Sequence, residues 1–136
     1  MALVIDASIA VGWIARSQAT RLTDAALAAV ADEFGVVPAY FGIEVARALR
    51  THERRNLLSA DVIDIGLAQL RALPLREDGA KTLDRLQQIV VLARRHELRV
   101  ADAAYLELAE RRALALACKD GPLKKAANQR GIRLWK

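Results

Sequence analysis

Short apolar runs alternate along the chain with longer segments in which apolar residues recur every three or four positions. The clearest short run is Leu3-Val4-Ile5, which leads directly to Asp6. A run of branched apolar residues that ends at small polar ones is typical of a fully buried strand. Residues 113–118 form a second such run, which leads to Asp120. The pattern therefore predicts two buried strands, each followed by an aspartate.

The rest of the pattern predicts three shorter strands and the helices that connect them. Strands are expected at residues 36–37 and 132–135, and at residues 73–75, where Pro74 favours an edge strand because it cannot donate to a ladder. With Ser59 as an N-cap and Gly131 as a stop, helical spacing predicts helices over residues 9–15, 20–34, 39–55, 59–71, 78–96 and 98–112, and a basic helix after residue 122. Strands that alternate with helices imply right-handed crossovers and a parallel sheet covered on both faces. We therefore expect an α/β fold with three layers, α/β/α, and a central parallel sheet.

Length and cysteine content add two expectations. A chain of 136 residues is long enough to bury one core, so we expect a single domain over residues 1–136. Cys118 is the one cysteine, which excludes an internal disulfide and indicates a reducing, cytoplasmic location. The first 15 residues are apolar, but they lack basic residues, contain Asp6 and are too short to cross a bilayer. We expect neither a signal peptide nor a membrane segment.

The charge balance favours a polyanionic partner. The chain has a formal net charge of +5, while aromatic residues make up 4% of it, so there is no aromatic ladder on which successive bases could stack. Contacts with a nucleic acid would therefore be made to its phosphates. The candidate residues are basic side chains that lead away from the predicted strand ends, and a solvated surface is their alternative role: Arg47, Arg50, Lys119, Lys124 and Lys125. The lysines bracket Asp120 and are the preferred candidates.

Four acidic residues are expected at one edge of the sheet. Asp6 and Asp120 follow strands, Glu44 lies in the opening turns of the helix after the second strand, and Asp102 begins the helix before the fourth. In parallel sheets these positions share the carboxyl edge, where ligands bind. Each acid alone is more often a helix cap or a solvated side chain. Four together repel one another unless a cation neutralises them, and hard oxygen ligands favour Mg²⁺ or Mn²⁺.

These acids lie in motifs that follow one another in a characteristic order. The motifs are Val4-Ile5-Asp6-Ala7-Ser8, residues 43–49 around Glu44, residues 102–109 from Asp102, and residues 116–123 around Asp120. The whole chain thereby resembles PIN-domain proteins of the VapC toxin type. The resemblance implies a PIN-like fold and a metal-dependent endoribonuclease, with the four acids at the family's acidic positions and Ser8 at the hydroxyl position. Two positions depart from the family, Cys118 where threonine is common and Ala101 where an aromatic residue is common, and neither changes a charge.

The resemblance also implies partners. Toxins of this type pair with a small antitoxin whose C-terminal segment lies across the active-site groove, and they tend to form homodimers. The predicted helices over residues 59–96 carry more apolar residues than a small sheet needs, which makes them a candidate partner surface, with core packing as the alternative: Ile63, Leu67, Leu70, Leu83, Leu86, Val90 and Val91.

The predicted chemistry is hydrolysis by water rather than by a side-chain nucleophile. No Ser-His-Asp or Cys-His pattern is evident, and His52 and His96 are isolated residues near helix C-termini. We expect Asp6, Asp102 and Asp120, with Glu44 directly or through water, to hold one or two Mg²⁺ ions. Ser8 is a candidate substrate contact or support for the metal site, with a helix cap as its alternative.

Other functions remain open at this stage. A PIN-domain nuclease outside a toxin pair, and a metal-binding regulatory or RNA-binding module without turnover, both fit the acids. A receiver-like domain would need an acid pair at the first strand and a phosphoacceptor on the middle strand, and a haloacid-type phosphatase would need an acid at position 8, where Ser8 stands. Metal-dependent turnover separates the nucleases from the modules that only bind.

Overall fold

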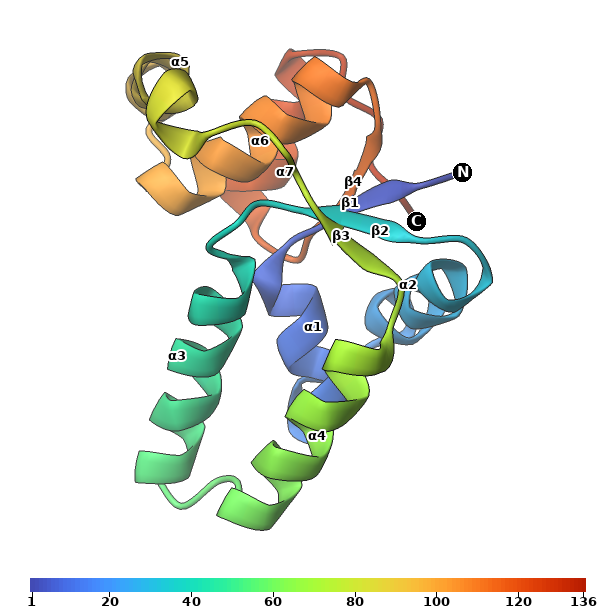
Figure 1. Ribbon diagram of the computed structural model, residues 1–136. Coiled ribbons are helices and arrows are strands. Elements are labelled where there is room, and N and C mark those ends of the chain that lie inside the picture. Colours follow the sequence, from blue (N-terminus) through green and yellow to red (C-terminus); the bar gives the residue numbers. More distant parts are fainter.

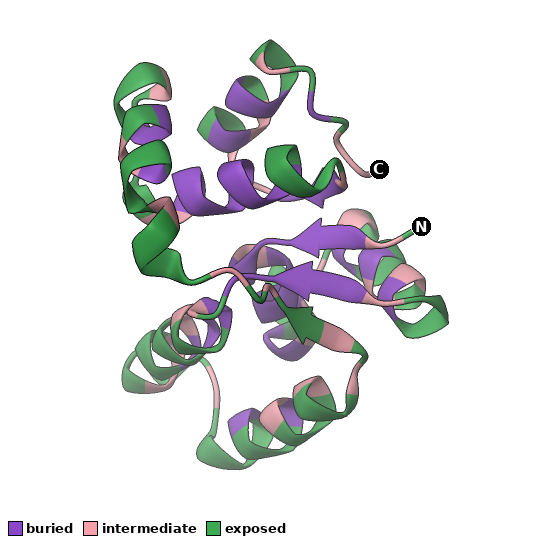
Figure 2. Ribbon diagram, turned by 45° about the horizontal axis from the view of Figure 1, so that its top comes forward, coloured by how far each residue is buried: buried purple, intermediate pink, exposed green.

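Four short parallel strands form the centre of the computed structural model, which describes residues 1–136 (Figure 1). Their spatial order is β3 (Leu75–Glu77), β2 (Gly35–Val37), β1 (Leu3–Ile5) and β4 (Ala115–Ala117). β1, β2 and β4 are buried throughout, whereas β3 is mostly exposed at its edge (Figure 2). Strands that are covered on both faces need apolar side chains at every position, which explains the continuous apolar runs in the sequence.

Helices cover both faces of this sheet. One side carries α1 (Ala7–Ile14), α2 (Arg21–Asp32), α3 (Phe41–Arg54) and α4 (Ala60–Ala72), with a short 3₁₀ turn at Arg16–Gln18, and the other carries α5 (Thr82–His96), α6 (Val100–Arg112) and α7 (Gly121–Gln129) (Figure 1). The three-layer α/β/α fold with a central parallel sheet is thus confirmed. None of the helices combines the length and the apolar character that crossing a membrane would require.

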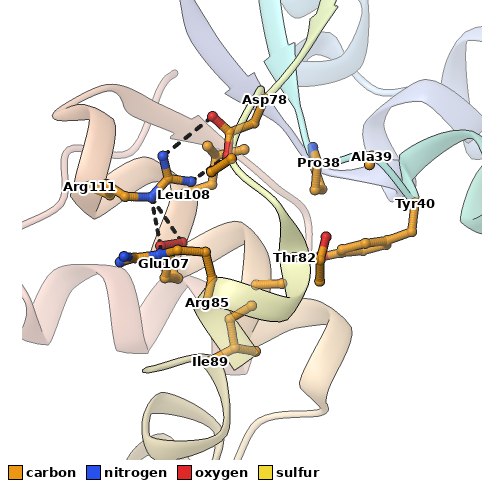
Figure 3. A pocket seen from close by; sticks show the side chains of 12 residues that line it. Pro38, Ala39, Tyr40, Asp78, Thr82, Arg85, Ile89, Glu107, Leu108 and Arg111 are labelled. Carbon is orange, nitrogen blue, oxygen red and sulfur yellow. Dashed lines mark hydrogen bonds and ion pairs between the residues drawn. The ribbon is translucent and has the colours of Figure 1, made fainter. Parts of the chain in front are cut away.

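The most deeply buried helix is α6, which lies against β1 and between α5 and α7. Every residue from Asp102 to Ala109 is buried, so this stretch of α6 has no side that faces solvent and carries two acids, Asp102 and Glu107, into the interior. Glu107 is neutralised where it lies, because Arg85 and Arg111 each donate to it at 2.7 Å. Arg111 also pairs with Asp78, and this network joins α5, α6 and the loop after β3 (Figure 3).

The predicted helices and strands lie within two residues of the observed ones, apart from the start of α5 and the predicted last strand. β3 begins after Pro74, and α5 begins at Thr82 rather than at residue 78. The second shift has a clear cause, because the amide of Asp78 donates to the carbonyl of Val37 at 2.8 Å and continues the pairing of the sheet. The edge position predicted for this strand is confirmed, and Pro74 lies directly before it rather than within it.

The predicted last strand, at residues 132–135, is wrong. Leu134 makes only an isolated parallel bridge to Leu116. The amide of Leu116 donates to the carbonyl of Arg133, and the carbonyl of Leu116 accepts from the amide of Trp135, both at 2.9 Å. Backbone groups alternate in direction along a strand, so the middle residue of three-residue β4 is the one that presents both groups to the open edge.

Candidate active site

The structure brings all four predicted acids to one groove at the carboxyl edge of the sheet. Asp6 follows β1 and precedes α1, Glu44 lies in the first turn of α3, Asp102 lies in the first turn of α6, and Asp120 precedes α7. Their side chains line the same open groove, whose volume is about 530 Å³. Ser8 lines it as well. Strand ends and helix starts that are far apart in sequence meet here because the strands are parallel.

Each carboxylate accepts a hydrogen bond from a protein group. Ser8 Oγ donates to Asp6, and Tyr105 donates to Glu44 Oε1 at 2.7 Å. Arg99 Nε donates to Asp102 Oδ2 at 3.1 Å, and the amide of Leu123 donates to Asp120 Oδ2 at 2.9 Å. Each of these bonds uses one carboxylate oxygen, so the carboxylates are oriented without being saturated.

Helix capping accounts for one of the four acids. Asp120 caps α7 through its bond from the amide of Leu123. Asp6 occupies the N-cap position of α1 but makes no side-chain capping bond, and Asp102 lies inside α6 rather than at its cap. Ser8 likewise lies within α1 and does not cap it. A capping role therefore does not explain why Asp6 and Asp102 are 5% and 7% exposed.

Burial raises the pKa of Asp6 to about 6. The negative charges of Asp102 and Glu44 contribute to this net rise in the pKa, while the hydrogen bond from Ser8 opposes it. Loss of water around a carboxylate penalises its charged form, and nearby like charges do the same. The groove therefore gathers negative charge that an added cation would relieve.

Basic residues line the same groove. Arg47, Arg99 and Lys119 surround the acids, and Lys119 Nζ donates to the carbonyl of Gln18 at 2.9 Å. Of the three predicted lysines, only Lys119 lines this groove. Lys124 is half-buried on another groove beside Trp135, and Lys125 is exposed on α7.

Sequence reasoning missed two residues of the site, Arg99 and Tyr105. Both lie three residues from Asp102, one on each side, and residues at that spacing share a helix face. Once Asp102 is a candidate, this spacing is the signal that could have identified them.

The donor set suits a hard divalent cation, because it consists of carboxylate oxygens alone. His52 lies on the groove, but its Nδ1 is bonded to the carbonyl of Ala48 at 2.9 Å. No three His, Cys, Asp or Glu side chains are arranged closely enough in this structure to hold a metal ion. The residues thus fit Mg²⁺ or Mn²⁺ by the chemistry of their oxygen atoms, but the carboxylates would have to move closer together to bind the ion.

The groove holds no activated side-chain nucleophile. The hydroxyl of Ser8 donates to Asp6, and no histidine accepts a proton from it. Cys118 is 2% exposed, and burial raises the pKa of its thiol to about 12, so it stays protonated at neutral pH. The arrangement is suited to hydrolysis in which water attacks.

Known proteins resemble this chain in sequence and in fold. No model of a known protein family matches the sequence. Ribonuclease VapC3 from two strains of Mycobacterium tuberculosis is 35% identical to it over 124 residues, which are 91% of this chain and 86% of the relative. The solved structure of PAE2754 from Pyrobaculum aerophilum matches with a TM-score of 0.71 at 20% identity, covering 93% of this chain and 87% of the other, and supports the PIN-like fold. The chain belongs to the VapC family of PIN-domain ribonucleases.

Proposed function

We propose that this protein is a Mg²⁺-dependent endoribonuclease and the toxin of a type II toxin–antitoxin pair. The observation that carries the proposal is the groove itself, in which four carboxylates and three basic side chains meet at the carboxyl edge of the sheet. The sequence similarity of the chain to Ribonuclease VapC3 supports the same activity.

Asp6, Asp102 and Asp120, with Glu44 directly or through water, would hold one or two Mg²⁺ ions, with Mn²⁺ as an alternative. When bound, such an ion lowers the pKa of water and offsets charge on a phosphate. The protein's own contribution is to position the acids. Ser8 orients Asp6, the α7 backbone orients Asp120, and the burial of α6 from Asp102 onward limits the water around Asp102.

RNA is the proposed substrate, held through its phosphates. Arg47, Arg99 and Lys119 lie on the groove beside the acids, where they can neutralise the backbone on either side of the bond to be cleaved. Target choice would then depend on the shape of the groove and on single-stranded RNA that can enter it.

An antitoxin and a second copy of the chain are the proposed protein partners. The candidate partner surface over residues 59–96 divides in the structure: Ile63 is in the core, and Leu67 and Leu70 pack against it. Leu83, Leu86 and Val91 are 81%, 40% and 42% exposed on α5. These α5 residues are the part of the predicted surface that is available to a partner. A cytoplasmic location is also proposed, since Cys118 is a free thiol.

The test is RNA cleavage by antitoxin-free protein with Mg²⁺ and with EDTA. We expect Asp6→Asn and Asp102→Asn to reduce cleavage by at least about a hundredfold, because each removes a charged ligand from the site. Asp32→Asn is the matched control, since Asp32 is exposed at the end of α2. Equal cleavage by wild type and by folded Asp6→Asn would contradict the proposed function.

Two observations favour a second function, RNA binding without turnover. Arg99 already neutralises Asp102, and no group of ligands is pre-arranged for a metal. A module of this kind would bind RNA but show no cleavage that depends on added Mg²⁺. The same assay, run beside a binding measurement, distinguishes the two.

A further inference from the structure

Tyr105 is a buried core residue whose hydroxyl reaches the candidate active site. Its side chain is 0% exposed, and the ring of Tyr40 packs edge-on against it, with centroids 6.0 Å apart and an interplanar angle of 74°. The hydroxyl donates to Glu44 Oε1 at 2.7 Å. A buried hydroxyl needs a partner, and a bond to a charged acceptor is stronger than one to a neutral acceptor. The position of the Tyr105 ring therefore fixes the position of one Glu44 oxygen.

This hydrogen bond differs from the other three that the acids accept. Ser8 is two residues from Asp6, and Arg99 and the Leu123 amide are each three residues from their partners. Tyr105 and Glu44 are 61 residues apart. The bond joins α3 to α6, one helical turn beyond Asp102. It thus links the helices that carry two of the acids.

Glu44 has the longest side chain of the four acids and is the one most in need of such support. It lies on α3, and it is only half-buried. Groups that hydrogen-bond to a metal ligand fix its orientation, and losing one typically weakens metal affinity by about 10- to 100-fold.

We infer that Tyr105 is a positioning residue of the metal site, which holds Glu44 at the groove through its hydroxyl. The inference rests on the proposed function, since it assigns a role to Tyr105 in binding the proposed ion. Tyr105 makes no contact with substrate in this role and acts through Glu44 alone.

The experiment compares two tyrosine variants that each lose one hydroxyl. Tyr105→Phe keeps the ring in the core and removes the bond to Glu44. Tyr40→Phe is the matched control, because the Tyr40 hydroxyl donates to the backbone carbonyl of Ala101 at 3.3 Å and not to an acid. Binding of Mg²⁺ and of Mn²⁺ is measured by calorimetry on the whole chain without RNA. We expect about tenfold weaker binding for Tyr105→Phe and a change below about twofold for Tyr40→Phe.

A double-mutant cycle separates positioning from general loosening of the fold. If Tyr105 acts through Glu44, then Tyr105→Phe lowers metal affinity in the wild type but has no further effect in Glu44→Ala. An equal loss in both backgrounds, or an equal loss for Tyr40→Phe, would overturn the inference. If Tyr105→Phe does not fold, Glu44→Asp replaces it, because a carboxylate one methylene shorter cannot reach the hydroxyl, and wild-type affinity in that variant would overturn the inference.

The outcomes for wild type and variant identify which proposal fails. A folded wild type that binds neither Mg²⁺ nor Mn²⁺ contradicts the proposed function and the inference together. A wild type that binds the ion as tightly as Tyr105→Phe does contradicts the inference alone.

Discussion

Arg99 pairs with Asp102 across the first turn of α6, with 3.1 Å between Nε and Oδ2. The two partners differ greatly in exposure, since the arginine side chain is 82% exposed and the aspartate side chain 9%. An exposed arginine loses little by leaving such a pair. The guanidinium can therefore exchange Asp102 for a phosphate when RNA enters the groove.

Arg99→Ala is expected to change the binding of metal and of RNA in opposite directions. Loss of a positive charge beside Asp102 should strengthen Mg²⁺ binding severalfold, by about 1 kcal/mol, since a competing cation is gone. RNA binding should weaken, because a phosphate contact is lost. Calorimetry with Mg²⁺ and filter binding with RNA measure the two effects. Arg50→Ala is the control, because Arg50 pairs with Glu53 on α3 and does not line the groove. Weaker binding of both ligands would show that Arg99 merely stabilises the site.

Lys119 is expected to contact the RNA backbone. The measurement uses an Asp6→Asn background, which does not cleave RNA. There, Lys119→Ala should weaken RNA binding. It should also make the slope of the logarithm of the binding constant against the logarithm of the salt concentration shallower by about 0.7, the value for one phosphate of a single strand. Titrations between low and moderate salt give this slope. Arg71→Ala, at an exposed position near the end of α4, should leave the slope unchanged. The same titration on Lys124→Ala and Lys125→Ala tests the remaining sequence-based candidates, and a larger change there than for Lys119→Ala would place the RNA path over α7.

The fold and the four acids were predictable because they depend on regular backbone rules. An apolar run before Asp6 and another before Asp120 predict buried strands, and parallel strands must bring their carboxyl ends to one edge. This reasoning needs no knowledge of side-chain positions. It predicted that Asp6, Glu44, Asp102 and Asp120 would meet, and the structure places them in one groove.

The partners of the acids were not predictable in the same way. The spacing from Asp102 marks Tyr105 as a candidate for the site, but its contact with Glu44 depends on how α3 and α6 pack. For the lysines, the sequence predicted too many residues. Lys119, Lys124 and Lys125 are all close to Asp120 in sequence, but only Lys119 lines the groove. α7 turns away after its cap, so the lysines on it follow the helix. Tertiary packing, which a local pattern does not encode, decides both cases.

Gly66 is required where α4 crosses α1. A Cβ at this position would lie 2.5 Å from Ile14 Cγ2, so we expect Gly66→Ala to destabilise the protein by about 1–3 kcal/mol through overpacking. Gly42→Ala is the matched control on α3, because a Cβ there meets no atom within 4 Å. Alanine at that position should be neutral or stabilising by up to about 1 kcal/mol. Urea denaturation measures both, and equal stability of the two variants would show that α4 shifts freely.

Asp6 is expected to lower the stability of the metal-free protein at neutral pH. Its pKa rises from 3.8 in the unfolded chain to about 6 in the fold, so the folded state binds more protons between these values. Stability therefore falls as the pH rises through this window, and the full cost, at most about 3 kcal/mol, is present above pH 6.

Asp6→Asn removes this titration while keeping an oxygen that can accept from Ser8. In EDTA we expect the variant to be more stable than wild type by about 1–3 kcal/mol at pH 7.5, with a difference near zero at pH 4. Urea denaturation at the two pH values measures the change, and Asp32→Asn, at an exposed carboxylate, is the control. The variant that abolishes cleavage would then be the more stable protein, as expected where like charges are held together to bind a cation. If the variant were less stable than wild type at pH 7.5, the charged Asp6 carboxylate would be stabilised by protein groups in the metal-free fold. This result would contradict the expectation that its charge destabilises the fold until a metal binds.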